Sequence, residues 1–251
     1  MMSVFDPNIY IKTVMLVGCG GTGATTARII ARILYDMKRS RKHTPQLVLV
    51  DPDVVEAKNI GRQLFSPAEE GRFKAEAIAR RLNFALGLDV AWVAEPIAPR
   101  HDDRQGNTLM ISCVDNHEAR GVINNLSGVL IASGNHRDGG QVCIGNANDP
   151  AHVRDFLGTD RYPYLPKEGL LFPELLQPEP VIEQPAPSCA ELVTMGEQSL
   201  LVNDWQANVV AGYVYKLLHR QPIHSFLTFI DSQAGVVVNK PICRDELEVY
   251  L

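Results

Sequence analysis

The chain has 251 residues, 45% of them apolar, a formal net charge of −5 and five cysteines. This composition is enough to build one globular domain with a substantial core, and it gives no basic footprint for nucleic acid. A local basic patch for an acidic partner remains open, because net charge does not describe single surfaces. The sequence contains no run of about 18 apolar residues, no signal-peptide pattern and no CxxC pair. We therefore predict a cytoplasmic protein without a membrane segment or a zinc site.

The first half of the chain alternates apolar runs with amphipathic segments. Continuous apolar runs that end in glycine or aspartate are typical of buried parallel strands. The alternation of these runs with helices predicts a Rossmann-like α/β fold, with a doubly wound, mostly parallel sheet. The predicted strands are 13–17, 46–50, 90–94, 108–114 and 128–132, and the predicted helices are 22–39, 72–86 and 117–126.

The pattern changes after residue 146. Residues 147–190 are rich in proline, which predicts a crossover loop without regular structure. A helix over 190–219 and a β-hairpin from 224–230 and 236–238 are expected to complete the fold. We therefore predict a single domain over 1–251, divided into a nucleotide-binding core (1–146), the crossover (147–190) and a C-terminal part (191–251).

A glycine-rich loop joins the first predicted strand to the first helix. Gly18, Gly20 and Gly23 fit the pattern GxGxxG, and Gly21 lies within it. Such a loop turns sharply, lets phosphate oxygens approach the backbone, and offers them the free N–H groups of a helix N-terminus. Asp51, at the end of the second strand, is placed to accept hydrogen bonds from ribose hydroxyls. At this point an NAD(P)-dependent oxidoreductase and an ATP-dependent enzyme are both open.

The residues after Asp51 favour ATP. Asn59, Arg62 and Lys74 follow within one short stretch. A hydride transfer develops little charge on phosphate, whereas a carboxylate that attacks the α-phosphate of ATP needs positive groups and a metal to reduce the repulsion. Asp53 and Glu56, in the same stretch, are expected to face solvent.

Taken together, these motifs resemble the ThiF/MoeB/HesA family, which includes the adenylation domains of ubiquitin-activating enzymes. The similarity runs from about residue 13 to residue 120, and the narrower likeness is to the small ThiF-like proteins of PRTRC gene systems. The residues that carry the resemblance are Gly18, Gly20, Gly21, Gly23, Asp51, Asn59, Arg62, Gln63, Lys74 and Asp115.

The resemblance implies ATP and Mg²⁺ as cofactors and a role for each residue. Asp51 would hold the ribose, Asn59, Arg62 and Gln63 would bind the nucleotide, and Lys74 would stabilise the pentavalent phosphorus. Asp115 would bind Mg²⁺. Asn116 and Arg120 follow in a helix start that is similar to the family's.

Simpler explanations remain for four of these residues. Asn59 is also compatible with a turn cap, and Arg62 with a surface ion pair. Lys74 is also compatible with the solvated face of its helix. Asp115 is also compatible with an N-cap of the next helix.

Some relatives use a cysteine on the crossover to accept the acyl group as a thioester. Cys189 occupies that place here, before the C-terminal helix, although no histidine or lysine adjoins it. It is therefore a candidate nucleophile, and the alternative is a helix-start cysteine without a reactive role. Cys19, Cys113 and Cys143 are expected to serve packing only.

The leading hypothesis is thus an adenylyltransferase that activates the C-terminal carboxylate of a small ubiquitin-like (β-grasp) protein and acts as a homodimer. The chain departs from many relatives because it lacks zinc-binding CxxC pairs and an arginine before the first strand. The alternatives are a variant that activates a non-protein group, a nucleotide-binding assembly protein without catalysis, and an NAD(P)-dependent oxidoreductase.

Overall fold

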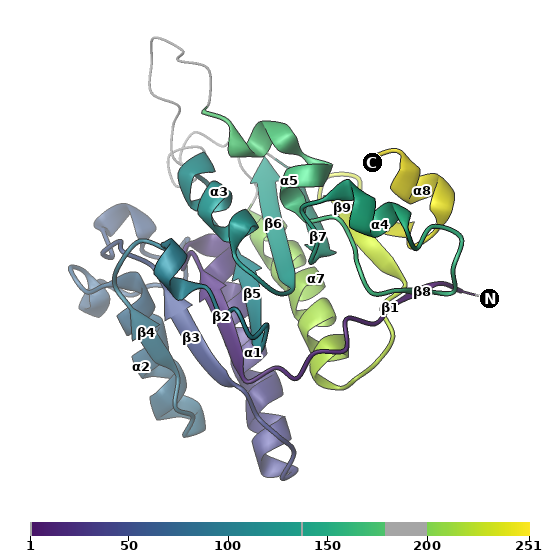
Figure 1. The fold of residues 1–251 in the computed structure, drawn as a ribbon. Coiled ribbons are helices and arrows are strands. Elements are labelled where there is room, and N and C mark those ends of the chain that lie inside the picture. Colours follow the sequence, from purple (N-terminus) through teal and green to yellow (C-terminus); the bar gives the residue numbers. More distant parts are fainter. Residues whose placement is uncertain (1, 137, 179–199) are drawn as a thin grey trace.

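The computed structural model describes residues 2–136, 138–178 and 200–251. A twisted central sheet carries helices on both faces (Figure 1). Its eight strands have the order β10-β9-β7-β6-β5-β2-β3-β4, and β1 and β8 form a separate pair. The strands are β1 (Val4–Phe5), β2 (Thr13–Val17), β3 (Gln46–Val50), β4 (Ala91–Val93), β5 (Thr108–Ser112), β6 (Leu130–His136), β7 (Gly139–Gly145), β8 (Arg161–Tyr162), β9 (Ser225–Asp231) and β10 (Val236–Pro241).

The first five strands of the large sheet are parallel, as predicted. β2 lies between β3 and β5, with β4 beyond β3 and β6 beyond β5. Leu16, Leu49 and Ile111 are fully buried at the centre of this region, because helices cover the sheet on both sides. The mostly parallel, doubly wound sheet is therefore confirmed.

β7 is a strand that the sequence pattern does not predict. It contains three glycines, which weaken strand propensity. The fold requires two of them for close approach: a Cβ on Gly140 would lie 1.9 Å from Gln206 Nε2, and one on Gly145 would lie 2.1 Å from the Pro166 carbonyl oxygen. β7 pairs antiparallel with β6 and β9, and so connects the predicted terminal hairpin, β9 and β10, to the sheet.

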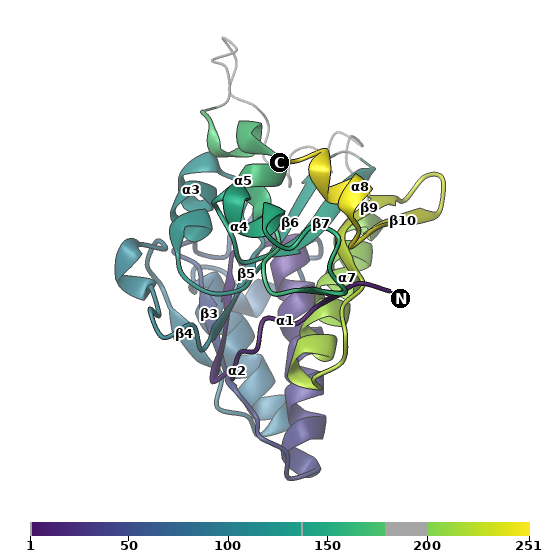
Figure 2. The ribbon, with the colours of Figure 1, turned by 45° about the vertical axis from the view of Figure 1, so that its right-hand side comes forward.

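The helices form one layer on each face of the sheet. α1 packs between α2 and α7 on one face, and Figure 2 shows α1 and α7 side by side, while α3 and α5 lie on the other face. No helix within the described stretches is both long and apolar enough to span a membrane. The helices are α1 (Gly21–Arg39), α2 (Lys74–Leu86), α3 (His117–Asn125), α4 (Pro150–Arg154), α5 (Glu168–Leu171), α7 (Leu200–Leu218) and α8 (Arg244–Glu248), and the 3₁₀ turns are η1 (Ala57–Asn59), η2 (Pro67–Glu69), η3 (Pro99–His101) and η4 (Pro173–Leu176).

The described part of the crossover is not irregular, so this prediction for residues 147–190 was wrong there. Pro150 begins α4, which Asp149 caps by accepting the N–H of Ala151 at 2.8 Å. Pro173 is likewise the first residue of η4, although no side chain caps this turn. Proline fits the first position of a helix because the N–H that it lacks would have no intrahelical partner there. Residues 179–190 lie outside the described residues.

Two buried charged residues attach the crossover to α3. Lys167 Nζ donates hydrogen bonds to the carbonyl oxygens of Asn124 and Leu126, at 3.3 and 2.6 Å. Glu168 Oε1 accepts a hydrogen bond from Arg120 Nη1 at 2.5 Å, with the two side chains 2% and 8% exposed. The crossover thus fixes both ends of α3, and it does so through charges that have lost most of their contact with water.

We expect the contribution of the buried Lys167 to the free energy of unfolding to rise with pH. Burial lowers the pKa of its ammonium group from 10.5 to about 8. Between these values the unfolded chain still binds a proton that the folded chain has released, so the free energy of unfolding rises with pH. The buried thiols of Cys19, Cys113 and Cys143 act in the opposite sense in both proteins, so the test is the difference between them. From neutral to alkaline pH the wild type should gain about 2–3 kcal/mol relative to Lys167→Met. Urea unfolding of both proteins at neutral and alkaline pH checks this, and an equal change with pH in both would contradict it.

Candidate nucleotide-binding site

A cavity lies where the strand order of the sheet reverses. The chain runs outward from β2 to β3 and β4, and then returns to β5 on the other side of β2. Parallel sheets bind ligands in the crevice at the carboxyl ends of the strands at this point. A cavity of about 460 Å³ opens there, and its polar lining includes Gly18, Gly20, Asp51, Asp53, Gln63, Lys74, Asp115, Asn116 and Glu118.

The glycine loop has the geometry that a phosphate loop needs. Gly18 has a φ of +88°, and a Cβ on it would lie 2.6 Å from the Cys113 carbonyl oxygen. Gly20 caps α1 without a side chain, so the first N–H groups of the helix lack a capping acceptor. These donors and the positive end of the helix dipole are together suited to a negatively charged group beside the cavity.

Gly23 packs directly against the backbone of Gly18, and we expect Gly23→Ala to disrupt the glycine loop. A Cβ at this position would lie 1.8 Å from the Gly18 carbonyl oxygen, and both groups belong to the backbone, so neither can turn aside. We expect a loss of about 3 kcal/mol in the free energy of unfolding. Gly121→Ala in α3 is the matched control, because its Cβ would meet nothing within 4 Å, and it should gain up to about 1 kcal/mol. Urea unfolding measures both, and equal stability of the two variants would contradict the prediction.

Asp51 holds the loop and also faces the cavity. Its Oδ2 accepts the N–H of Cys19 at 2.5 Å, and its Oδ1 accepts the N–H of Asp53 at 2.8 Å. Burial raises the pKa of the Asp51 carboxyl, although these two hydrogen bonds and Lys74 oppose the shift. The carboxylate is thus fixed in place by the backbone, and each oxygen keeps lone pairs for a ligand hydroxyl.

Lys74 is not on a solvated face of its helix, because it is 8% exposed and lines the cavity. Its Nζ donates to Asp53 Oδ2 at 2.9 Å. The Asp53 side chain is 64% exposed, as predicted, yet it also orients the lysine. An ammonium held at the wall of the cavity, with donors left after this bond, can meet a phosphate oxygen.

Asp115 follows β5 and is exposed on the rim of the cavity. It is not the N-cap of α3, because Asn116 takes that position and accepts the N–H of Ala119 at 2.8 Å. The simpler explanation for Asp115 was therefore wrong, and its carboxylate is available to the cavity. Arg120, in the next turn, points instead to Glu168 below the site.

The remaining predicted residues divide into two groups. Gln63 lines the cavity, and its Oε1 is buried without a hydrogen-bond partner among the described residues. Asn59 and Arg62 do not line the cavity. Asn59 is 2% exposed, and its Oδ1 accepts the N–H of Glu56 at 2.9 Å, which is the turn cap that the simpler explanation proposed.

A polar network behind the loop was missed by the sequence reasoning. Asn203, near the start of α7, accepts hydrogen bonds from Thr22 Oγ1 and Asn135 Nδ2, at 2.9 and 2.7 Å. Gln206, one turn later, donates to the Gly134 carbonyl oxygen at 2.6 Å. Little in the sequence indicates these contacts, since amide side chains in a helix usually face solvent. The network couples the helix after the crossover to the phosphate loop.

Cys19, Cys113 and Cys143 were expected to serve packing, and their positions agree with this, although Cys113 lies outside the observed strand. Cys19 and Cys143 are buried, and burial raises the pKa of both thiols well above the usual value. Cys113 lies just after β5 rather than within it, and burial raises its pKa to about 11 although it touches the cavity. None of these thiols is activated. Cys189, the candidate nucleophile, lies outside the described residues.

The lining fits ATP better than an uncharged ligand. The loop supplies N–H donors for phosphates, Asp51 an acceptor for ribose hydroxyls, Lys74 a cation, and Gln63 a buried acceptor that needs a donor. Asp115 alone cannot enclose a metal, and no cluster of three metal-ligating side chains occurs in the described part of the chain. A Mg²⁺ that takes most of its ligands from phosphate and water is compatible with one carboxylate.

The sheet and the glycine loop define an α/β protein of the Rossmann type. Within this class the chain belongs to the ThiF family, whose sequence model matches residues 8–232. The predicted family is therefore confirmed, and the narrower likeness to PRTRC-system proteins stays a prediction.

The curated relatives are activating enzymes. The chain is 34% identical to ubiquitin-like modifier-activating enzyme 5 of Drosophila ananassae over 129 residues, which cover 45% of this chain and 30% of the relative. The same enzyme of Culex quinquefasciatus is 33% identical over 128 residues, with 45% and 30% covered. The match thus spans less than a third of the length of these relatives.

Solved structures with the same fold are more distant in sequence. A structure of E. coli MccB with ATP is 16% identical, with a TM-score of 0.59 over 93% of this chain and 64% of that one. PaaA is 17% identical, with a TM-score of 0.57 over 92% and 64%. At these identities the likeness supports the fold alone.

Proposed function

We propose that this protein uses ATP and Mg²⁺ to adenylate the C-terminal carboxylate of a small ubiquitin-like protein. One observation carries the proposal: Asp51, Lys74 and Asp115 meet the glycine loop around a single cavity. The names of the curated relatives support a ubiquitin-like substrate. Because the match covers only 30% of the length of these relatives, their activity is a proposal for this chain.

The proposed reaction joins a carboxylate to the α-phosphorus of ATP. A carboxylate oxygen of the substrate attacks the α-phosphorus, the bond from that phosphorus to the oxygen bridging it to the β-phosphate breaks, and pyrophosphate leaves with the electron pair. The products are an acyl-adenylate and pyrophosphate. Both reactants are negative, so the barrier depends on how well the site offsets their repulsion.

Each residue of the cavity has a task in this reaction. The N–H groups at the start of α1 would bind phosphate oxygens, and Asp51 would hold the ribose hydroxyls. Lys74 would leave Asp53 in part and donate to the α-phosphate as its charge grows. Asp115 would hold Mg²⁺, which offsets the charge of the leaving pyrophosphate. Gln63 would gain a donor for its buried oxygen.

Arg62 and Asn59 have different places in the proposal. Asn59 holds the segment after β3 in shape through its bond to Glu56. Arg62 lies in the same segment, outside the cavity lining. Its proposed contact with the triphosphate therefore requires the side chain to turn toward the cavity when the nucleotide binds.

A second step through Cys189 is compatible with the acyl-adenylate. Its thiolate would attack the acyl carbon, and AMP would leave as the thioester forms. A thioester that is cleaved by reducing agent and absent from Cys189→Ala would support this step. Its persistence in that variant would exclude the residue. The homodimer remains part of the proposal, and light scattering of the purified protein measures it.

Partner-dependent exchange of label between pyrophosphate and ATP tests the proposed function. We expect exchange only when Mg²⁺ and a cognate ubiquitin-like protein with an intact C-terminus are present. Removal of the terminal glycine of that partner should abolish it. ATP binding without exchange would indicate an assembly protein, and NAD binding without ATP binding would indicate an oxidoreductase.

A further inference from the structure

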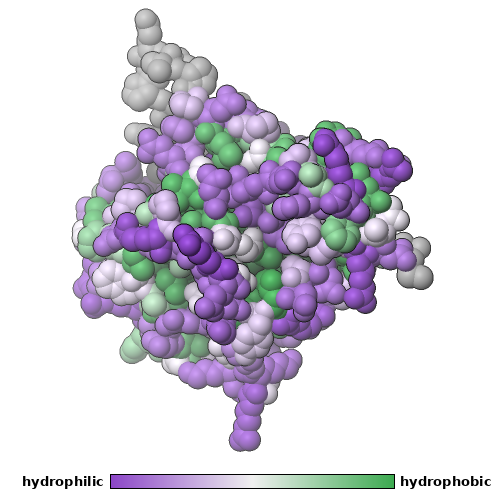
Figure 3. Space-filling view, in the orientation of Figure 1, coloured by the Kyte–Doolittle hydropathy of each residue, from purple (hydrophilic) through white to green (hydrophobic). Residues whose placement is uncertain are grey.

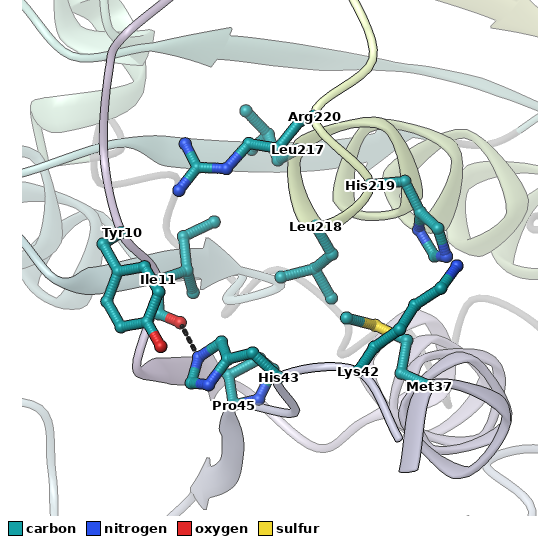
Figure 4. A pocket seen from close by; sticks show the side chains of 10 residues that line it. All are labelled: Tyr10, Ile11, Met37, Lys42, His43, Pro45, Leu217, Leu218, His219 and Arg220. Carbon is teal, nitrogen blue, oxygen red and sulfur yellow. Dashed lines mark hydrogen bonds between the residues drawn. The ribbon is translucent and has the colours of Figure 1, made fainter. Parts of the chain in front are cut away.

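A second pocket lies at the opposite end of the sheet from the nucleotide site. It has a volume of about 310 Å³ and is formed by the last turns of α1 and α7, the segment before β2 and the segment before β3. Figure 4 shows the side chains that surround it. The floor is apolar, since Ile11, Met37 and Leu217 are buried there and Leu218 is half-buried.

The rim of this pocket is positively charged in a protein of negative net charge. Lys42 and Arg220 line it together with two histidines, and none of its ten lining residues is acidic. Within residues 2–136, 138–178 and 200–251, neither Lys42 nor Arg220 makes an ion pair. In Figure 4 Arg220 extends toward the side of Tyr10 and Ile11, Lys42 lies on the His219 side, and Leu218 lies between them. In Figure 3 the lower tip of the molecule, where α1 ends in Figure 1, is hydrophilic.

The backbone holds Arg220 in a conformation that arginine rarely adopts. Arg220 lies two residues after the end of α7 and has a φ of +54°, and the N–H of Gln221 donates to the Lys216 carbonyl oxygen. This is the position where helices usually have glycine, because a side chain there costs about 1 kcal/mol or more. Arg41, two residues after α1, has the same φ of +54°. After α7 this conformation puts Arg220 among the residues that line the pocket.

Two aromatic contacts fix the histidines of the rim. His43 stacks on Tyr10 at 4.5 Å, and its Nε2 donates to the Ile11 carbonyl oxygen at 2.8 Å. His219 stacks on Tyr215 at 4.0 Å, and its Nδ1 donates to the Tyr215 carbonyl oxygen at 2.9 Å. The walls of the pocket are therefore ordered before any ligand arrives, which lowers the entropic cost of binding.

We propose that this pocket binds an organic dianion, with one negative group on Lys42, the other on Arg220, and an apolar linker over Ile11 and Leu218. Carboxylate and phosphate share the required chemistry, since a guanidinium group binds either one through two parallel hydrogen bonds. A ligand with a single charge would leave one cation unused, and a neutral ligand would leave both. The size of the pocket is at the lower end for small-molecule sites, which suits a short linker.

Calorimetric titration of the full chain with linear dicarboxylates, from succinate to suberate, tests the proposal. Alkane bisphosphonates with the same linkers form a second series, and monocarboxylates of equal length form the reference. We expect one linker length to bind best, and about three to ten times tighter than its monocarboxylate. The series that binds tighter identifies carboxylate or phosphate as the natural group.

Variants separate this pocket from the nucleotide site and from the fold. Arg220→Gly and Lys42→Gln should each weaken binding about three to ten times, and Arg220→Gly should keep or raise the Tm because glycine suits its backbone. Arg41→Gly is the matched control: it makes the same change at the same kind of helix end, but Arg41 does not line the pocket. It should change binding about twofold or less. Saturating ATP should not displace the dianion.

Three results would overturn the proposal. The first is that neither series binds. The second is equal binding of dianions and monocarboxylates. The third is unchanged binding in Arg220→Gly and Lys42→Gln. The activity proposed for the nucleotide site does not enter any of these outcomes, so the two proposals can fail separately.

Discussion

Replacing Lys74 by alanine should lower the rate of partner-dependent ATP–pyrophosphate exchange by about 100-fold or more while the protein stays folded. The expected loss is that of a single preorganised donor directed at charge that grows in the transition state. The fold should tolerate the change, because the partner that Lys74 leaves behind, Asp53, is 64% exposed and can be solvated by water. Exchange rates and urea unfolding of the same preparation measure the two effects.

Lys58→Ala is the matched control for this experiment. Lys58 belongs to the same segment of the chain, makes an exposed ion pair with Glu56 at 3.0 Å, and does not line the cavity. We expect its exchange rate to stay within about twofold of the wild type. Full exchange activity in Lys74→Ala would remove this lysine from the proposed mechanism.

Replacing Glu168 by alanine should cost about 3–5 kcal/mol in the free energy of unfolding. The substitution leaves the Arg120 guanidinium, 8% exposed, without its carboxylate, and an unpaired buried charge is far more costly than the loss of the pair itself. Burial raises the pKa of the Glu168 carboxyl, and the charge of Arg120 opposes this. The ionised form of Glu168 therefore depends on the positive charge of Arg120.

A double-mutant cycle separates the pair from the packing around it. Arg120→Met combined with Glu168→Met should recover at least about 2 kcal/mol relative to the sum of the single changes. Asp6→Ala, which breaks an exposed pair with Arg161, should cost less than about 1 kcal/mol. Additive effects in the cycle would show that Arg120 and Glu168 do not depend on one another.

Part of the site could be predicted from the sequence because its residues are close to elements with strong local signals. The glycine loop, Asp51 and Asp115 follow strands whose apolar runs are easy to recognise, and parallel strands bring their carboxyl ends together. Asn59 and Arg62 belong to a segment held by local turns, so sequence order could not tell which side chains face the cavity. Asn203 and Gln206 reach the site from about 180 residues away, and no local pattern indicates such a contact.

The helices of the crossover and the second pocket could not be predicted from sequence patterns either. Proline predicts a break in regular structure, yet Pro150 and Pro173 each begin a helix, because the outcome depends on position within the turn. Lys42 and Arg220 are separated by most of the chain and meet only because α1 and α7 pack side by side and end at the same level.

The sequence by itself determined the class of the protein: a parallel sheet, a phosphate loop between its first strand and helix, and membership of the ThiF family. The sheet and the loop follow from periodicity and from glycines at fixed spacing, which act over a few residues. The family follows from the resemblance of the ordered set of motifs between about residues 13 and 120. Only the tertiary structure decided that β7 joins the sheet, that Asp53 orients Lys74 and that Glu168 buries Arg120. Such pairings depend on burial and distance between remote segments, and both arise only when the chain packs.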